Sequence, residues 1–164
     1  MLLSEQAYQR IDRELTKFPD DQKRSAVMAA LAIAQEEKGW LSTDVIRDVA
    51  DYLRLPAIAV QEVATFYDMY NTRPVGRFKI TVCTNLPCAL RDGVKTMEYL
   101  KEKLGVGANE TTEDGLFTIT EGECMGSCGD SPLMLVNDKH MCVHMSPDRI
   151  DAMIDELKQH GESA

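Results

Sequence analysis

Residues 78–88 have the sequence FKITVCTNLPC, in which a short alternating segment leads directly into a pair of cysteines. From Phe78 to Val82, apolar residues alternate with polar ones, which is the pattern of a β-strand with one buried face. The strand is therefore predicted to end at Cys83, and four residues separate this cysteine from Cys88. The two cysteines therefore flank a turn between this strand and a predicted helix.

A second pair of cysteines, Cys124 and Cys128, begins after an interval of 35 residues. This interval is long enough for a helix and a strand that bring the two cysteine loops together. Gly122, Gly126 and Gly129 accompany the second pair and leave room for a bulky group beside the sulfur atoms. They also allow backbone N–H groups to turn toward the sulfurs, as in an anion-binding nest.

The number and setting of the cysteines indicate a metal or cluster site. The chain has five cysteines, and this odd number without a secretion signal argues against a disulfide framework. A [2Fe–2S] cluster takes four thiolates, two per iron, and the C-x4-C and C-x3-C spacings favour it. A structural four-cysteine zinc site, which usually has C-x2-C spacing, stays open as an interaction module without a redox role. Buried free thiols are disfavoured, because the four cysteines lie in loops that contain glycine and proline.

The fifth cysteine, Cys142, lies between His140 and His144 on a predicted strand. Positions i, i+2 and i+4 of a strand share one face, so these three side chains resemble a metal site. No glycine-rich loop or fourth ligand accompanies them, and we interpret the segment as an ordinary strand.

Residues 4–70 are predicted to form four short helices with short connections, which is typical of a small bundle. The second helix is expected over residues 22–38 after an acidic cap, and the third begins at Ser42 or Thr43. The fourth is expected over residues 60–67 and has a poorly capped start, because no side-chain acceptor precedes it.

Residues 73–76, RPVG, interrupt the helical pattern and mark a domain boundary. We expect a four-helix bundle over residues 1–72 and a second domain over residues 73–164. The second domain is predicted to have the order β-α-β-β-β-α, with its first two strands linked by a crossover helix. This order makes a small α/β sandwich, and a thioredoxin-like arrangement agrees with it.

Within the second domain, a helix of about 15 residues is expected after Cys88, with one apolar face turned inward. Residues 105–115 are predicted to form a polar loop, and a hairpin is expected to turn at residues 137–138. The last helix is expected to start at Ser146, a good N-cap that precedes a proline. The inward residues expected on the first of these helices are Leu90, Val94, Met97, Leu100 and Leu104.

The composition disfavours several classes of protein. The chain has 164 residues with 18 Lys and Arg against 27 Asp and Glu, a formal net charge of −9. A phosphate backbone repels such a chain, so nucleic acid is not an expected partner. No apolar run approaches the roughly 18 to 20 residues that span a bilayer, so direct membrane insertion is not expected. Because the N-terminus turns polar too early for a signal peptide, a cytoplasmic protein is expected.

Four segments give the chain its resemblance to a known family, and that resemblance covers nearly the whole sequence. They are EVATFY at residues 62–67, RPVG at 73–76, VCTNLPC at 82–88 and GECMGSCGDSP at 122–132. Together they resemble the E-subunit family of NADH:quinone oxidoreductase. Its members are the small [2Fe–2S] subunit in the NADH-dehydrogenase module of respiratory complex I.

The resemblance implies an N-terminal helical bundle followed by a thioredoxin-like [2Fe–2S] ferredoxin domain. It implies that Cys83, Cys88, Cys124 and Cys128 hold one [2Fe–2S] cluster, with no catalytic residue of the chain's own. The implied partner is the flavoprotein subunit that binds NADH and FMN, and the implied role is one-electron exchange with that FMN. We expect the helical bundle to serve in docking, within a complex that keeps this subunit peripheral to the membrane.

Two observations qualify this expectation. Residues 105–110 lack the third glycine of a dinucleotide fingerprint and do not follow a predicted strand, so this chain alone is not expected to bind NADH or FMN. A similar small subunit also occurs in NAD-linked formate dehydrogenases and hydrogenases, which therefore stay open as alternatives to complex I.

Overall fold

The computed structural model describes residues 1–162 and divides the chain into two compact units. The first unit covers Met1–Pro74 and the second begins at Val75, so the division falls inside the predicted breaker. Along residues 1–162, every helix is too short or too polar to cross a membrane.

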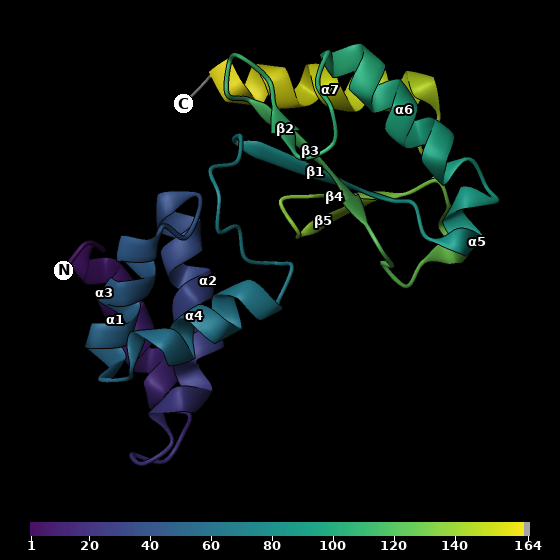
Figure 1. The fold of residues 1–164 in the computed structure, drawn as a ribbon. Helices are drawn as coiled ribbons and strands as arrows, with labels where there is room; N and C mark the ends of the chain where they lie inside the picture. Colours follow the sequence, from purple (N-terminus) through teal and green to yellow (C-terminus); the bar gives the residue numbers. More distant parts are fainter. Residues whose placement is uncertain (163–164) are drawn as a thin grey trace. The chain divides into compact units, whose positions relative to one another are not determined.

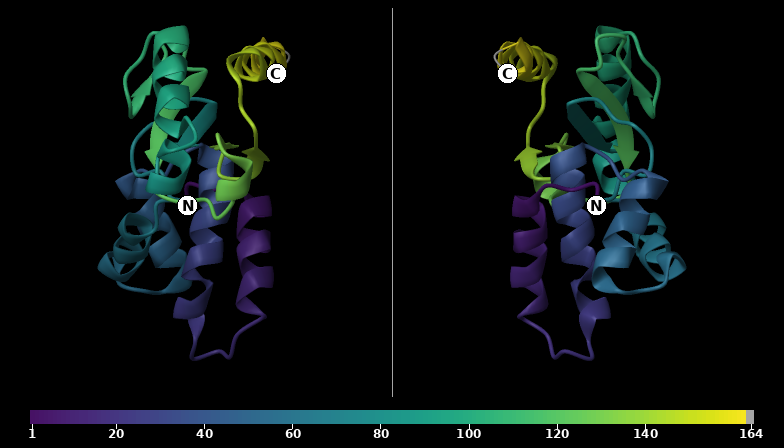
Figure 2. Two further views of the ribbon diagram at one scale, coloured as in Figure 1. Left: turned by 90° about the vertical axis from the view of Figure 1, so that its right-hand side faces the viewer. Right: turned by 90° about the vertical axis from the view of Figure 1, so that its left-hand side faces the viewer.

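The first unit contains four α-helices and one short 3-10 turn, η1. Their bounds are α1 Glu5–Leu15, η1 Lys23–Ala26, α2 Val27–Lys38, α3 Thr43–Leu53 and α4 Ala57–Phe66. Figure 2 shows α1 and α2 side by side in opposite directions, and Figure 1 shows α3 and α4 in the same unit. The apolar faces of all four helices meet in one core, which includes Ile11, Leu31, Val49, Leu53 and Val60.

Two helix starts in this unit differ from the predictions. The α-helical part of the second helix begins only at Val27, because the preceding residues form η1, and Gln22 at the start of that turn makes no side-chain cap. The fourth helix begins early, at Ala57 directly after Pro56, although no side chain caps it. The third helix begins as expected, since the Ser42 hydroxyl accepts from the N–H of Val45 at 3.2 Å.

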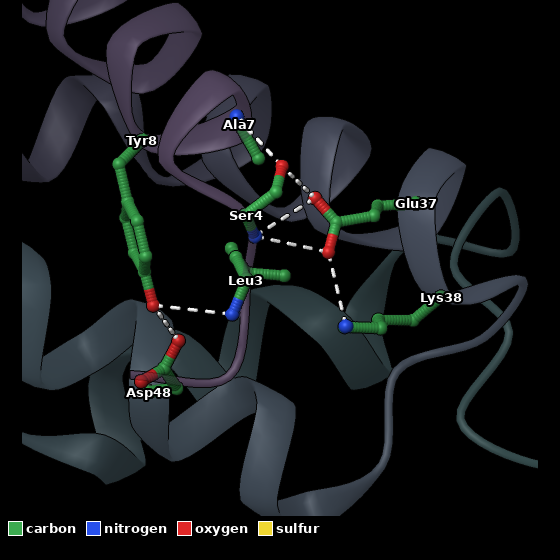
Figure 3. Close-up of polar contacts among 7 residues, drawn as sticks. All are labelled: Leu3, Ser4, Ala7, Tyr8, Glu37, Lys38 and Asp48. Atoms are coloured by element: carbon green, nitrogen blue, oxygen red, sulfur yellow. Dashed lines mark hydrogen bonds and ion pairs between the residues drawn. The ribbon is translucent and has the colours of Figure 1, made fainter.

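A polar network fastens the start of α1 to α2 and α3 (Figure 3). The Ser4 hydroxyl caps α1 by accepting from the N–H of Ala7 at 3.2 Å, and it donates to Glu37 of α2 at 2.6 Å. The backbone N–H of Ser4 also donates to both carboxylate oxygens of Glu37 at 3.1 Å. Nearby, the Tyr8 hydroxyl donates to Asp48 of α3. Polar contacts thus join three helices whose apolar faces already share one core.

The second unit is built on a mixed five-stranded sheet with the order β2-β3-β1-β4-β5. The strands are β1 Phe78–Cys83, β2 Glu110–Thr111, β3 Phe117–Gly122, β4 Met134–Val136 and β5 His140–Cys142. Strands β1 and β3 are parallel and adjacent, whereas the other neighbouring pairs are antiparallel. The helices of this unit are α5 Leu86–Ala89, α6 Gly93–Leu104 and α7 Pro147–Glu162, and a 3-10 turn, η2, covers Cys128–Asp130.

Helices α6 and α7 lie next to each other on one face of this sheet (Figure 1). Alternate residues of the strands face them, so the apolar half of each strand is buried against the helices. This core includes Ile80, Val82, Met97, Leu100, Phe117, Ile119, Met134, Ile150 and Ile154. The predicted α/β architecture with a crossover between the first two long strands is confirmed.

The helix predicted after Cys88 is present as α6, with Met97, Leu100 and Leu104 facing the core, but it begins only at Gly93 and is separated from α5, which contains Cys88. Asp92 has a φ of +66°, a left-handed conformation that separates the two helices. The break turns Leu90 outward, where it is 80% exposed, and Val94 is also exposed, contrary to expectation. The expected loop at residues 105–115 contains the short strand β2.

The hairpin and the last helix agree with the predictions. Asn137 and Asp138 both have positive φ angles, 52° and 56°, within the three-residue turn that joins β4 to β5 and pairs Val136 with His140. The Ser146 hydroxyl accepts from the N–H of Arg149 at 3.4 Å at the start of α7.

The network around Ser4 predicts an acid-sensitive contribution to stability. Hydrogen bonds from Ser4, followed by Lys38, lower the pKa of Glu37 to about 2, whereas a free glutamate has a pKa of about 4.3. A carboxyl group with a lower pKa in the folded state stabilises the fold above its unfolded pKa, and this contribution disappears as the pH falls toward 2. The free energy of unfolding should therefore fall less in Glu37→Gln than in the wild type as the pH decreases from about 4.3 toward 2.

Urea unfolding followed by circular dichroism between acid and neutral pH measures this difference. The matched control is Asp20→Asn, which removes an exposed carboxylate from the loop after α1. Equal pH dependence in wild type and Glu37→Gln would contradict the role of this carboxylate.

Candidate metal centre

The parallel pairing of β1 and β3 brings the two cysteine pairs to one end of the sheet. Cys83 is the last residue of β1 and lies opposite Gly122, the last residue of β3. Parallel neighbours end at the same edge of a sheet, so both following loops emerge there. Figure 1 shows α5, which carries Cys88, and the loop after β3, which carries Cys124, at this same end.

The four cysteines differ in their exposure. Cys83 and Cys88 are at most 1% exposed and form a small apolar cluster with Leu133. Cys128 is partly buried against this cluster, whereas Cys124 is exposed. The site therefore has a buried side made by the first loop and an accessible side made by the second.

Backbone contacts hold the first loop against the neighbouring segments. The N–H of Cys83 donates to the carbonyl of Leu133 at 3.1 Å, and the N–H of Thr84 donates to the carbonyl of Gly122 at 3.2 Å. The start of α6 lies so close that a Cβ at Gly93 would stand 2.6 Å from the carbonyl oxygen of Cys83. Glycine at this position is thus a steric requirement of the loop, and a larger residue would displace it.

The second loop is shaped by the turn between its two cysteines. Gly126 has a φ of +75°, a conformation that favours glycine, and a Cβ there would meet no atom within 4 Å. At the base of the loop, a Cβ at Gly122 would stand 2.8 Å from the side chain of Thr81 and 2.9 Å from that of Met125. Gly126 is therefore favoured by its backbone conformation, and Gly122 by the small space beside it.

The thiols influence each other's protonation. Burial raises the pKa of Cys83, and the hydrogen bond to Cys88 adds to this effect. Burial also raises the pKa of Cys128, together with the nearby charge of Cys88. For Cys88, burial acts in the same direction, but hydrogen bonds from Ser131, Cys83 and Cys128 outweigh it and lower its pKa. The lowered pKa of Cys88 favours its thiolate, the form that binds metal.

Cys142 lies apart from the other four cysteines. It is partly buried against the main core between the sheet and the helices, and burial raises its pKa. Strand β5 ends at Cys142, and His144 beyond it has a φ of +52°, so the strand alternation does not continue to that histidine. The His144 ring nitrogen lies 3.5 Å from a carboxylate oxygen of Asp130.

The donor set of the site suits a cluster that takes thiolates in pairs. Two cysteines come from each loop, and three of them interact with one another. Among residues 1–162, no three His, Cys, Asp or Glu side chains are grouped closely enough to ligate a single metal ion.

Sequence reasoning missed two polar residues beside the cysteines. The Ser131 side chain is buried and its hydroxyl lies 3.5 Å from the carbonyl oxygen of Cys88. The Arg91 guanidinium donates to the second cysteine loop, at the carbonyls of Cys128 and Gly129. Ser131 lies within the 122–132 motif but was not singled out, and the only available signal for Arg91 was its position shortly after Cys88.

Comparisons with known proteins agree with this geometry. Residues 11–158 match the family model of the thioredoxin-like [2Fe-2S] ferredoxins. The chain is 41% identical over 145 residues to the E subunit of the NADH-quinone oxidoreductase of Rickettsia bellii, covering 88% of this chain and 86% of the relative. It is 37% identical over 150 residues to the second such E subunit of Rhizobium meliloti, covering 92% and 88% of the two chains.

A solved structure shares the fold at lower sequence identity. A chain of an NAD+-reducing [NiFe]-hydrogenase in its air-oxidized state matches with a TM-score of 0.70 and 18% identity, over 87% of this chain. The match covers only 24% of the hydrogenase chain, so this chain corresponds to about a quarter of it.

Proposed function

Because the chain belongs to the family of thioredoxin-like [2Fe–2S] ferredoxins, we propose that it is the electron-transferring E subunit of an NADH:quinone oxidoreductase. The cluster, when bound, supplies one-electron transfer. The observation that supports the proposal is the parallel pairing of β1 and β3, which starts both cysteine loops at one edge of the sheet, in a chain about 40% identical to named E subunits. The chain contributes to this oxidoreductase as a subunit, without catalytic residues of its own.

The ligands of the cluster in this proposal are Cys83, Cys88, Cys124 and Cys128. The first two are buried, which excludes water from their sulfurs, and the second loop provides the accessible side. The lowered pKa of Cys88 favours the thiolate that iron requires. Backbone N–H groups of the glycine-containing loop are available to offset the negative charge of such a site.

NADH and FMN belong, in this proposal, to a partner flavoprotein subunit. Gly105, in the segment that partly resembles a dinucleotide fingerprint, instead ends α6 with a φ of +68°. The chain therefore offers a redox site and a docking surface, and the organic cofactors are bound elsewhere. Association with the assembled complex would keep this subunit peripheral to the membrane.

The hydrogenase and formate dehydrogenase alternatives keep the cluster and change the complex. The chain is only 18% identical to the NAD+-reducing hydrogenase, so this comparison shows a shared fold and does not indicate a shared complex. Identities of 37% to 41% to E subunits over most of both chains favour the quinone oxidoreductase.

The helical unit has an exposed apolar surface that supports a docking role. Ile58 and Phe66 of α4 are 65% and 77% exposed, and Tyr67 and Met69 directly after this helix are exposed as well. Exposed aromatic and methionine side chains at one site are typical of protein interfaces. We propose that this surface binds the flavoprotein subunit.

Replacement of single cysteines tests the ligand set. Cys88→Ser should remove most of the iron and sulfide from the purified full chain, because an alcohol is a poor substitute for a thiolate ligand. Cys142→Ser should leave both near the wild-type content, since Cys142 lies apart in the main core. Chemical assays of iron and sulfide per chain provide the measurement. Iron loss in Cys142→Ser with retention in Cys88→Ser would show that the ligand set is wrong.

A substitution in α4 tests the docking surface. Phe66→Ser should weaken binding to the flavoprotein subunit about tenfold, the effect expected of one exposed aromatic anchor. Co-purification and titration of the two subunits measure it, with cluster content checked in parallel. The control is Thr65→Ser, which keeps a hydroxyl at the neighbouring exposed position. Unchanged affinity in Phe66→Ser would exclude this surface.

A further inference from the structure

Arg91 is bonded to both cysteine loops at once. It lies between α5 and α6, three residues after Cys88, and its backbone N–H donates to the carbonyl oxygen of Cys88 at 3.0 Å. Its side-chain Nη1 donates to the carbonyl oxygens of Cys128 and Gly129 at 3.1 and 2.7 Å. The main chain of this residue is thereby fixed to the first loop, and its side chain is fixed to the second.

The contact joins segments that are 37 and 38 residues apart in sequence. The 3-10 turn η2 begins at Cys128, so the guanidinium binds this turn at its first two carbonyl groups. Cys128 and Cys88 also interact directly through their thiols. Arg91 thus spans the gap between the buried first loop and the partly exposed second loop.

Arg91 also brings a permanent positive charge to the site, because a guanidinium stays protonated at all physiological pH values. The neighbouring cation Lys95 is 83% exposed in its side chain and is paired with Asp92 at 2.7 Å. Arg91 is also exposed, but unlike Lys95 it makes its hydrogen bonds to backbone carbonyls of the cysteine loop.

We propose that Arg91 is a positioning residue that holds the second cysteine loop against the first and raises the reduction potential of the four-cysteine site. This inference rests on the proposed function, because it requires a bound [2Fe–2S] cluster. Reduction adds one electron, supplied by an external reductant, and therefore one negative charge to the site without a proton. A cation beside the ligands stabilises the more negative state, so its removal lowers the potential.

Three substitutions separate the charge from the hydrogen bonds. Arg91→Lys keeps the charge and a donor, Arg91→Gln keeps donors without the charge, and Arg91→Met keeps neither. In the full chain with its cluster, we expect Arg91→Gln to decrease the equilibrium constant for reduction about tenfold. This is about 59 mV toward lower potential for a one-electron couple. Arg91→Lys should stay within about twofold of wild type, since its charge is retained. A redox titration followed by EPR gives these values.

Two further measurements distinguish the proposal from a general loss of structure. Lys95→Gln removes a positive charge from the next helix and should leave the potential unchanged, because that charge is exposed and already paired. In the cluster-free protein, Arg91→Met should speed hydrogen exchange of the amides in residues 128–131, whereas Arg91→Lys should not. This second readout does not depend on a bound cluster.

The outcomes are separable from those of the proposed function. Absence of iron and sulfide from the wild-type chain would refute the cluster, whereas a wild-type cluster with an unchanged potential in Arg91→Gln would overturn the role of Arg91 alone. An equal shift in Lys95→Gln would also overturn it. If Arg91→Gln does not retain a cluster, Arg91→Lys decides: a cluster at wild-type potential supports the proposal, and a second loss of the cluster contradicts it.

Discussion

The parallel pairing of β1 with β3 is the constraint on which the site depends. It sets Cys83 opposite Gly122 and so starts both cysteine loops at the same edge of the sheet. The crossover through α5 and α6 is necessary for parallel strands to be neighbours, and its tight start at Gly93 presses α6 against the carbonyls of the first loop. Without this pairing, nothing else in the fold described above would bring two cysteine pairs that are separated by 35 residues in sequence to the same edge of the sheet.

The sequence predicted those parts of the fold that depend on local chemistry. Strand β1, the positive-φ turn at Asn137 and the caps at Ser42 and Ser146 follow from neighbouring residues, and the structure contains them. The break between α5 and α6 was missed because Asp92 adopts a left-handed conformation that its residue type permits but does not require. The apolar Leu90 then lies outside, although its spacing matched a buried helix face.

In the candidate site, too, the features set by neighbouring residues could be predicted and those set by tertiary packing could not. The cysteine pairs were recognisable from their spacing and glycine-rich setting, because both are local properties of the chain. The different exposure of Cys83 and Cys124 depends on tertiary packing against Leu133 and its neighbours. The contact of Arg91 with Cys128 and Gly129 likewise joins distant segments, and no pattern of residue types specifies it in advance.

Iron and sulfide analysis combined with EPR, on full-length protein purified without oxygen, tests the central claim most directly. We expect about two iron ions and two sulfide ions per chain. We also expect an EPR-silent oxidised protein and a rhombic signal from one unpaired electron after reduction with dithionite. About one zinc ion per chain, with no sulfide and no signal after reduction, would contradict a [2Fe–2S] cluster and favour a structural zinc site.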